Sequence, residues 1–237
     1  MFKQHLASDP KIIARLSATI ILIRDTDEGV KVLLMRRNSK LNFCAGMWVF
    51  PGGAVDDKDA LNANNAENET EILKFAAVRE TLEEAGIVID IDDLLPVSRW
   101  VTPQGVAKRF DTAFFLAAVN DASVCVDGSE IVDSLWVTPA EAIAKHRTQD
   151  VEFLPPTLIS LMGIAAFETV DEVLAHYKNK PINNYLPKVS FLDEQLIMLY
   201  PGDNAYESGR PEDDSAMHRC VYNADGWQYI NAIGVQL

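Results

Sequence analysis

The sequence predicts an α+β fold, a sandwich of helices with a mixed β-sheet. Strand-like and helix-like segments alternate, but they lack the regular βαβ rhythm of a doubly wound parallel sheet. The chain has 237 residues, of which 48% are hydrophobic and 24% charged. This composition is typical of a globular protein, and a chain of this length buries about 70% of its unfolded surface. We therefore expect a substantial core in one large domain, or in one domain with an extension.

The charge balance excludes several classes of function. Acidic residues number 35 and basic residues 21, which gives a formal net charge of −14. Nucleic-acid phosphates must be met by Lys and Arg, so we expect no nucleic-acid partner. The best apolar run, Ala18–Ile23, is only as long as a strand, and we expect no membrane partner. No secretory leader is predicted at the N-terminus, and three widely spaced cysteines suggest neither disulfides nor zinc. A reduced, cytoplasmic protein is expected.

The first half of the chain begins with a hairpin. Its strands are Ser17–Ile23 and Val30–Met35, joined by a polar turn. A short strand at Trp48–Phe50 leads into Pro51–Gly53, where paired glycines predict a tight turn. Residues 56–71 are acidic and rich in Asn, and we expect a loop there with at most one turn of helix.

A helix from Glu71 to Gly86 follows, with Gly86 as its C-terminal stop. Beyond it, strands alternate with helices. Thr138 and Pro139 predict the start of a helix that ends near Arg147, and the chain after residue 150 becomes mainly helical. The expected elements are strands at Leu95–Val101, Phe110–Val119 and Ile131–Val137, helices at about 156–167 and 170–178, and short strands near Lys188–Phe191 and Gln195–Tyr200.

The helix before Gly86 carries an unusual acidic stripe. Glu80, Glu83 and Glu84 stand at i, i+3 and i+4 and therefore share one face. The apolar residues expected on the opposite face, against the sheet, are Phe75, Val78, Leu82 and Ala85. Three neighbouring carboxylates repel one another unless a cation neutralises them, and hard oxygen ligands suit Mg²⁺ or Mn²⁺. The alternative is an ordinary solvated face, with Arg79 and Glu83 as a surface pair.

The order of residues around this stripe resembles the Nudix box of the Nudix hydrolases. That motif is glycine, five residues, Glu, seven residues, Arg-Glu, a hydrophobe, any residue, Glu-Glu, any residue, glycine and a hydrophobe. Glu71 and the run Arg79–Ile87 match it, with Thr81 at a position that is usually more apolar. Gly53 lies 12 residues too early for the compact pattern, so the acidic segment is an insertion, at about residues 56–70.

This resemblance implies a fold and a set of roles. The fold would be the Nudix α/β/α sandwich with a mixed sheet, over about residues 12–150, with residues 151–237 as a mainly helical extension packed on the same domain. Glu80, Glu83 and Glu84 would bind Mg²⁺ or Mn²⁺, and Glu83 would also be essential for catalysis. Arg79 would orient a ligand carboxylate. Glu71 would be a further ligand or position the water, and Glu130 is our candidate general base.

A narrower resemblance concerns the substrate. Leu34–Arg37, Gly46–Gly53, Arg99–Pro103 and Arg109–Thr112 are similar to the Nudix branch that includes the peroxisomal acyl-coenzyme A diphosphatases. This implies a nucleoside-diphosphate small molecule as substrate, with coenzyme A or its acyl esters as the first choice. Arginine suits phosphate oxygens, and the residues expected to contact the substrate are Gly52, Gly53, Arg37, Arg99 and Arg109, with Arg36 also near the site and Trp48 and Trp100 as candidates for base stacking.

Other functions stay open at this point. ADP-ribose, a nucleotide sugar or a dinucleotide could replace coenzyme A as the substrate of the same chemistry. A Nudix-fold sensor that binds a nucleotide metabolite without cleaving it is the non-enzymatic alternative, although the helix glutamates are all present. RNA decapping fits the family but not the charge of −14. A homodimer is possible.

Overall fold

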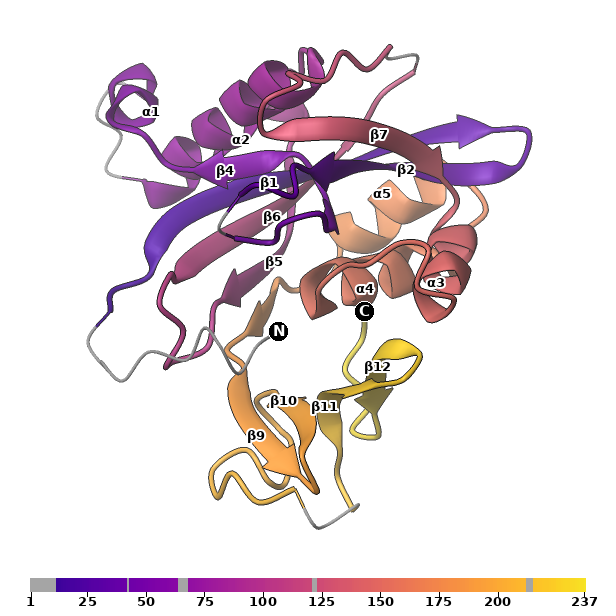
Figure 1. Ribbon diagram of the computed structural model, residues 1–237. Helices are drawn as coiled ribbons and strands as arrows, with labels where there is room; N and C mark the ends of the chain where they lie inside the picture. The colour runs from indigo at the N-terminus through magenta and orange to yellow at the C-terminus, as the bar shows by residue number, and fades with distance from the viewer. Residues whose placement is uncertain (1–11, 42, 64–67, 121–122, 212–214) are drawn as a thin grey trace.

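The computed structural model describes residues 12–41, 43–63, 68–120, 123–211 and 215–237. An eight-stranded sheet forms its centre, in the order β3-β2-β1-β6-β5-β8, with β4 paired to β1 and β7 paired to β2 (Figure 1). The β1–β6 and β5–β8 pairs are parallel and the others antiparallel, so the sheet is mixed, as expected. The strands are β1 (Arg15–Thr26), β2 (Gly29–Arg37), β3 (Trp48–Val49), β4 (Gly52–Ala54), β5 (Leu95–Val101), β6 (Phe110–Ala118), β7 (Ile131–Val137) and β8 (Asn183–Tyr185).

Both faces of this sheet are covered, because its central strands alternate between two apolar clusters. On β1, Ile20 and Leu22 enter the cluster beneath α2, whereas Ile21 and Ile23 enter the cluster on the opposite face. Successive side chains of a strand point to opposite faces, so a continuous apolar run is what a doubly covered strand requires. The covering helices are α1 (Asp57–Asn62) and α2 (Glu69–Ala85) on one face, and α3 (Pro139–Arg147), α4 (Pro155–Ile164) and α5 (Val170–Lys178) on the other (Figure 1). The α/β/α layering is confirmed.

Helix α2 is present as predicted, but its buried face matches the predicted one only in part: Ala85 is buried and Val78 packs partly buried on the core. It begins after Asn68, whose side chain accepts a hydrogen bond from the Thr70 N–H (3.0 Å), and ends at Gly86, which adopts a left-handed conformation (φ 70°). Leu82, expected against the sheet, is 48% exposed. The buried residues are instead mostly small: Leu73, Ala76, Ala77, Thr81, Glu84 and Ala85. Small side chains let the helix approach the sheet closely, which carries part of the acidic stripe inward with them.

The paired glycines do not form the expected tight turn. Gly52 and Gly53 begin β4 and pair with Thr19 and Ala18 of β1. Glycine is required at Gly52, because a Cβ there would overlap the β1 backbone, and a Cβ at Gly53 would displace the carboxylate of Glu80. Between β4 and α2, the acidic segment forms α1, capped by reciprocal hydrogen bonds between Asp56 and Asp59. Residues 64–67 of that segment lie outside the described residues.

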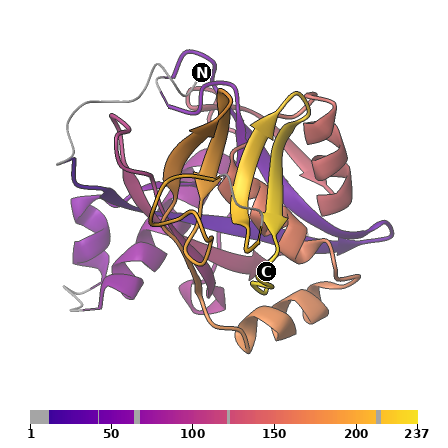
Figure 2. The same ribbon diagram turned by 90° about the horizontal axis from the view of Figure 1, so that it is seen from below.

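The extension after residue 150 is not mainly helical. Beyond α4 and α5 it contains β8, which joins the central sheet, and a second, antiparallel sheet in the order β12-β11-β10-β9 (Figure 2). The strands are β9 (Lys188–Leu192), β10 (Gln195–Leu199), β11 (His218–Asn223) and β12 (Gly226–Asn231). Met198, Tyr200 and Trp227 belong to the same apolar cluster as Ile21 and Leu34 of the central sheet. In the described residues, no helix has the length and apolar character needed to span a membrane.

Candidate active site

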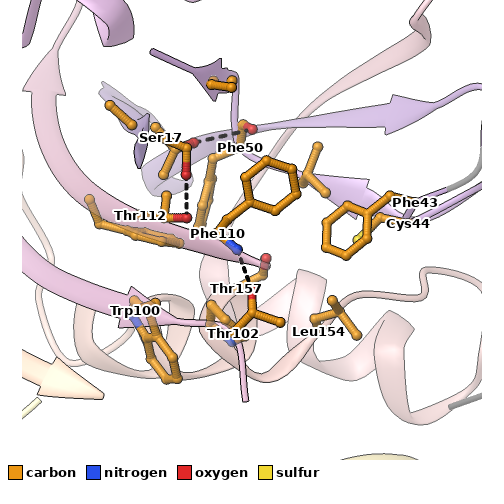
Figure 3. Close-up of a pocket in the computed structure, with 18 of the residues that line it drawn as sticks. Ser17, Phe43, Cys44, Phe50, Trp100, Thr102, Phe110, Thr112, Leu154 and Thr157 are labelled. Atoms are coloured by element: carbon orange, nitrogen blue, oxygen red, sulfur yellow. Dashed lines mark hydrogen bonds between the residues drawn. The ribbon is translucent and has the colours of Figure 1, made fainter. Parts of the chain in front are cut away.

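A cavity with a volume of about 490 cubic ångströms lies between the central sheet and the extension. One end is acidic, where β4 and α2 meet, and the rest is lined mainly by apolar and aromatic side chains. Figure 3 shows the aromatic part, with Phe43, Phe110 and Trp100 around the same space. The lining comes mainly from the strands β1–β6, the loops that follow β2 and precede β7, α2, the start of α4 and the extension residues Pro187, Met198 and Tyr200.

The acidic end is built by Glu80 and Glu84 of α2, which face the glycine strand β4. Glu84 is 5% exposed, and one carboxylate oxygen accepts a hydrogen bond from the Gly52 N–H at 3.0 Å. Burial raises the pKa of Glu84 to about 8; the Gly52 N–H opposes this shift, and the negative charge of Glu80 adds to it. Burial also raises the pKa of Glu80, while Arg79 acts in the opposite direction. In both glutamates, burial therefore disfavours the charged form.

Arg79 is the main cation beside these carboxylates. Its Nη1 donates to Glu80 at 2.9 Å and to Glu83 at 3.1 Å. Its Nε and Nη2 donate to both carboxylate oxygens of Asp59, and Nη2 also donates to the Ala54 carbonyl. One guanidinium therefore connects α1, β4 and two of the glutamates expected to be metal ligands.

The three expected metal ligands do not converge on one point. In the described part of the chain, no group of three or more His, Cys, Asp or Glu side chains is arranged to hold a metal ion. The reason is visible in the hydrogen bonds: Arg79 binds Glu80 and Glu83, and Glu84 binds the Gly52 amide. The side chain of Glu83 is 59% exposed and does not line the cavity.

Two further expected residues lie at the acidic end. Glu130 lines the cavity, and its carboxylate lies 3.9 Å from Nη2 of Arg37, which also lines the cavity. The negative charge of Glu130 contributes to the raised pKa values of both Glu80 and Glu84. Glu130 is held by a turn in which Asp127 accepts hydrogen bonds from the backbone N–H groups of residues 129–131.

Besides Glu83, three more of the expected site residues do not line the cavity. Glu71 pairs with Lys74 at 3.8 Å on the surface of α2. Arg99 binds Asp111 through Nε and Nη2 and Glu69 through Nη1. Arg109 is buried and donates to the carbonyl oxygens of Ile12, Thr102 and Pro103. Both guanidiniums are thus bound to partners within the fold, away from the cavity lining.

The aromatic candidates are also structural. Trp100 lines the cavity, but its ring stacks on Tyr185 with centroids 3.8 Å apart and is 5% exposed. Trp48 packs on the core, with Arg36 over its ring, and does not line the cavity. Arg36 itself pairs with Asp133 at 3.4 Å.

Sequence reasoning missed several residues of the site. Arg15 and Lys108 add positive charge to the cavity lining, and Thr157 brings a hydroxyl from α4. Arg15 and Lys108 stand beside predicted strands, which was a usable signal. Asp59 gave none, because it lies among many other acidic residues of the inserted segment.

Comparison with known proteins agrees with this architecture. Residues 14–156 match the NUDIX domain model. The chain is similar to human acyl-coenzyme A diphosphatase NUDT19, with 28% identity over 76% of this chain and 73% of that one, and to its Xenopus laevis counterpart, with 22% identity over 77% and 72%. It also resembles putative nudix hydrolase 7 of Caenorhabditis elegans, with 26% identity over 81% and 74%.

Among solved structures, a NUDIX hydrolase from Alicyclobacillus acidocaldarius superposes with a TM-score of 0.64 at 24% identity. The match covers 70% of this chain and 97% of that one. At this identity the likeness concerns the fold, and it agrees with the mixed sheet and its helical layers. The family match covers more than half of the chain, and the chain therefore belongs to the Nudix hydrolase family.

Proposed function

We propose that this Nudix hydrolase cleaves the diphosphate of coenzyme A or its acyl esters with the help of a divalent cation. The observation that carries the proposal is the cavity itself, in which buried carboxylates beside a glycine strand adjoin an apolar, aromatic space. A diphosphate linked to a long, partly apolar arm fits such a division. The relatives named acyl-coenzyme A diphosphatase support this substrate class.

Nudix hydrolases in general use divalent metals, and the acidic end of this cavity suits one. Burial raises the pKa of Glu84 and of Glu80, so a cation bound beside them would stabilise their charged forms. Together with Glu83 they provide the hard oxygen donors that Mg²⁺ and Mn²⁺ prefer. A bound cation would neutralise diphosphate oxygens and lower the pKa of the attacking water.

The chain's own residues would supply the rest. Gly53 has no side chain, so the Glu80 carboxylate can lie against the β4 backbone, beside the position proposed for the diphosphate. Arg37 lies beside Glu130 and, with Lys108 and Arg15, offers positive charge to phosphate oxygens. Glu130 is our candidate to accept the proton of the attacking water, and it is better placed for this than Glu71. Cleavage between the two phosphorus atoms would give 3′,5′-ADP and a phosphopantetheine product.

We also propose that residues 151–237 are part of the catalytic unit. Leu154, Thr157, Pro187, Met198 and Tyr200 line the cavity opposite the Nudix helix. The extension would then decide which arm of a substrate is accepted, while the carboxylates act on the diphosphate.

The test is turnover by the purified chain with Mg²⁺ or Mn²⁺. Coenzyme A, an acyl-coenzyme A, ADP-ribose and a nucleotide sugar are incubated separately, and products are separated by chromatography. Release of 3′,5′-ADP from the coenzyme A substrates supports the proposal, and activity on ADP-ribose alone refutes the substrate. Tight binding without turnover of any diphosphate would favour a sensor instead.

Two variants give this test a matched control. Glu84→Gln removes a carboxylate from the cavity. We expect turnover to fall by at least about 100-fold, because loss of a direct ligand should cost no less than the 10–100-fold typical of a group that only orients a ligand. Glu141→Gln removes the same group from the exposed start of α3 and leaves turnover unchanged. Equal rates in both variants would exclude Glu84 from the site.

A further inference from the structure

Asp59 is buried in a segment where burial is not expected. It lies in α1, a six-residue helix of the acidic insertion, and is the only residue of that helix that is fully buried. A carboxylate is almost never fully buried unless it is paired. The inserted segment thus contributes one buried charged group, the carboxylate of Asp59.

The partner of Asp59 is the arginine of the Nudix box. Nε of Arg79 donates to one carboxylate oxygen at 2.9 Å and Nη2 donates to the other at 2.8 Å. The second oxygen also accepts the Asp56 N–H at 2.8 Å. Burial alone would raise the pKa of Asp59, but these hydrogen bonds outweigh it and the pKa is lowered, so Asp59 is a carboxylate here.

This two-point contact fixes the direction of the remaining guanidinium nitrogen. Guanidinium is planar and its donors form a rigid fork. With its Nε–Nη2 edge held by Asp59, Nη1 is aimed at Glu80 (2.9 Å) and Glu83 (3.1 Å). Arg79 then gives each glutamate one hydrogen bond and leaves their other oxygens to other partners.

We propose that Asp59 is a positioning residue, which holds the two-donor edge of Arg79 and thereby keeps Glu80 and Glu83 available to a divalent cation. The inference rests on the proposed metal site. Without the charge of Asp59, that edge is free to form a bidentate pair with a glutamate. Such a pair competes directly with a cation for the same oxygens. The insertion in the box thus supplies a functional group as well as added length.

The test measures Mn²⁺ binding by electron paramagnetic resonance, without substrate. We expect Asp59→Asn to bind Mn²⁺ about 10–100-fold more weakly than the native chain, the usual effect of removing a group that orients metal ligands. Asp57→Asn is the matched control, since it removes an exposed carboxylate from the same helix. It should bind Mn²⁺ like the native chain. Asp59→Glu keeps the charge and should recover part of the affinity.

A double-mutant cycle separates positioning from a structural role. If Asp59 acts through Arg79, Asp59→Asn weakens Mn²⁺ binding in the native background but adds nothing in an Arg79→Gln background. An equal loss in both backgrounds, or native affinity in Asp59→Asn, overturns the inference. Failure of both Asp59→Asn and Asp59→Glu to fold, judged by thermal unfolding without metal, also overturns it. If the native chain itself binds no Mn²⁺, the proposed metal site fails instead.

Discussion

His146 joins three parts of the protein, and its replacement should be costly. The ring lies in α3 and is 2% exposed. Its Nε2 accepts the Trp227 N–H of β12 at 3.0 Å, and its Nδ1 lies 3.1 Å from the Val151 carbonyl. Because an amide donates to Nε2, the proton of the neutral ring must be on Nδ1. The ring also stacks on Phe153, with centroids 4.1 Å apart.

The perturbation is His146→Ala. It removes the hydrogen bonds that the ring makes with the Trp227 N–H and the Val151 C=O, at about 1–3 kcal/mol each in this buried setting, and removes a ring contact worth about 1 kcal/mol. We expect a loss of about 4 kcal/mol in the free energy of unfolding. For a chain of this size, that lowers the unfolding temperature by about 8–16 °C.

The same contacts predict a pH dependence. Burial lowers the pKa of His146, with the Val151 carbonyl and Glu152 acting in the opposite direction. At this site the folded state therefore binds fewer protons than the unfolded state, and the contribution of His146 to stability falls as pH drops below the ordinary value of about 6.5. His218 is also buried with a lowered pKa, so His146→Gln, which does not titrate, should remove only part of the slope.

The assay is urea unfolding between pH 8 and 5, followed by tryptophan fluorescence. A loss below about 1 kcal/mol in His146→Ala at pH 8 would refute the hydrogen-bond reasoning. Equal pH slopes in the native chain and His146→Gln would refute the titration reasoning.

Three other outcomes are expected. In the metal-free protein the raised pKa of Glu84 gives a contribution to stability that falls as pH rises from about 4.5 to about 8, opposite in sign to that of the buried histidines. Glu84→Gln removes this contribution, so in urea titrations with a chelator present stability should increase more with pH than in the native chain; an unchanged slope would contradict it. Arg219→Met leaves Asp203 buried and unpaired and should lower the unfolding free energy by about 3–5 kcal/mol, whereas a change below about 1 kcal/mol would show that the pair is dispensable. Leu73→Ala should cost about 2–5 kcal/mol and Leu82→Ala less than about 1 kcal/mol, because only Leu73 is buried; the reverse order in calorimetry would restore the predicted helix face.

The central sheet was largely predictable because its signals are local. Strands β5 and β7 have the predicted bounds, and so does α3, which Thr138 caps with Pro139 at its first position. Strands β11 and β12 were missed. In β11, His218 and Arg219 are buried, and the Arg219 charge is offset by Asp203, sixteen residues earlier. A pattern based on apolar alternation does not detect a strand whose buried residues are polar.

The site was predictable in its helix but not in its surroundings. Spacing alone placed Glu80, Glu83 and Glu84 on neighbouring turns, and Glu80 and Glu84 do line the cavity. The arginines were harder, since a guanidinium serves a phosphate or a carboxylate equally well. Arg99 turned to Asp111 and Glu69, and Arg109 to backbone carbonyls. The partner of each arginine depends on which groups the fold brings close to it. The spacing of residues along the chain does not determine this.

Strand β8 belongs to the C-terminal extension, but it pairs with β5 in the central sheet. It hydrogen-bonds to β5 as an edge strand, and its Tyr185 ring covers Trp100. Truncation of the chain at residue 156, where the family match ends, would remove β8. It would expose the edge of β5 and the indole ring of Trp100, and an exposed edge strand promotes aggregation. Chimeras that exchange substrate preference between relatives should keep β8 with its host and swap only the sequence beyond it.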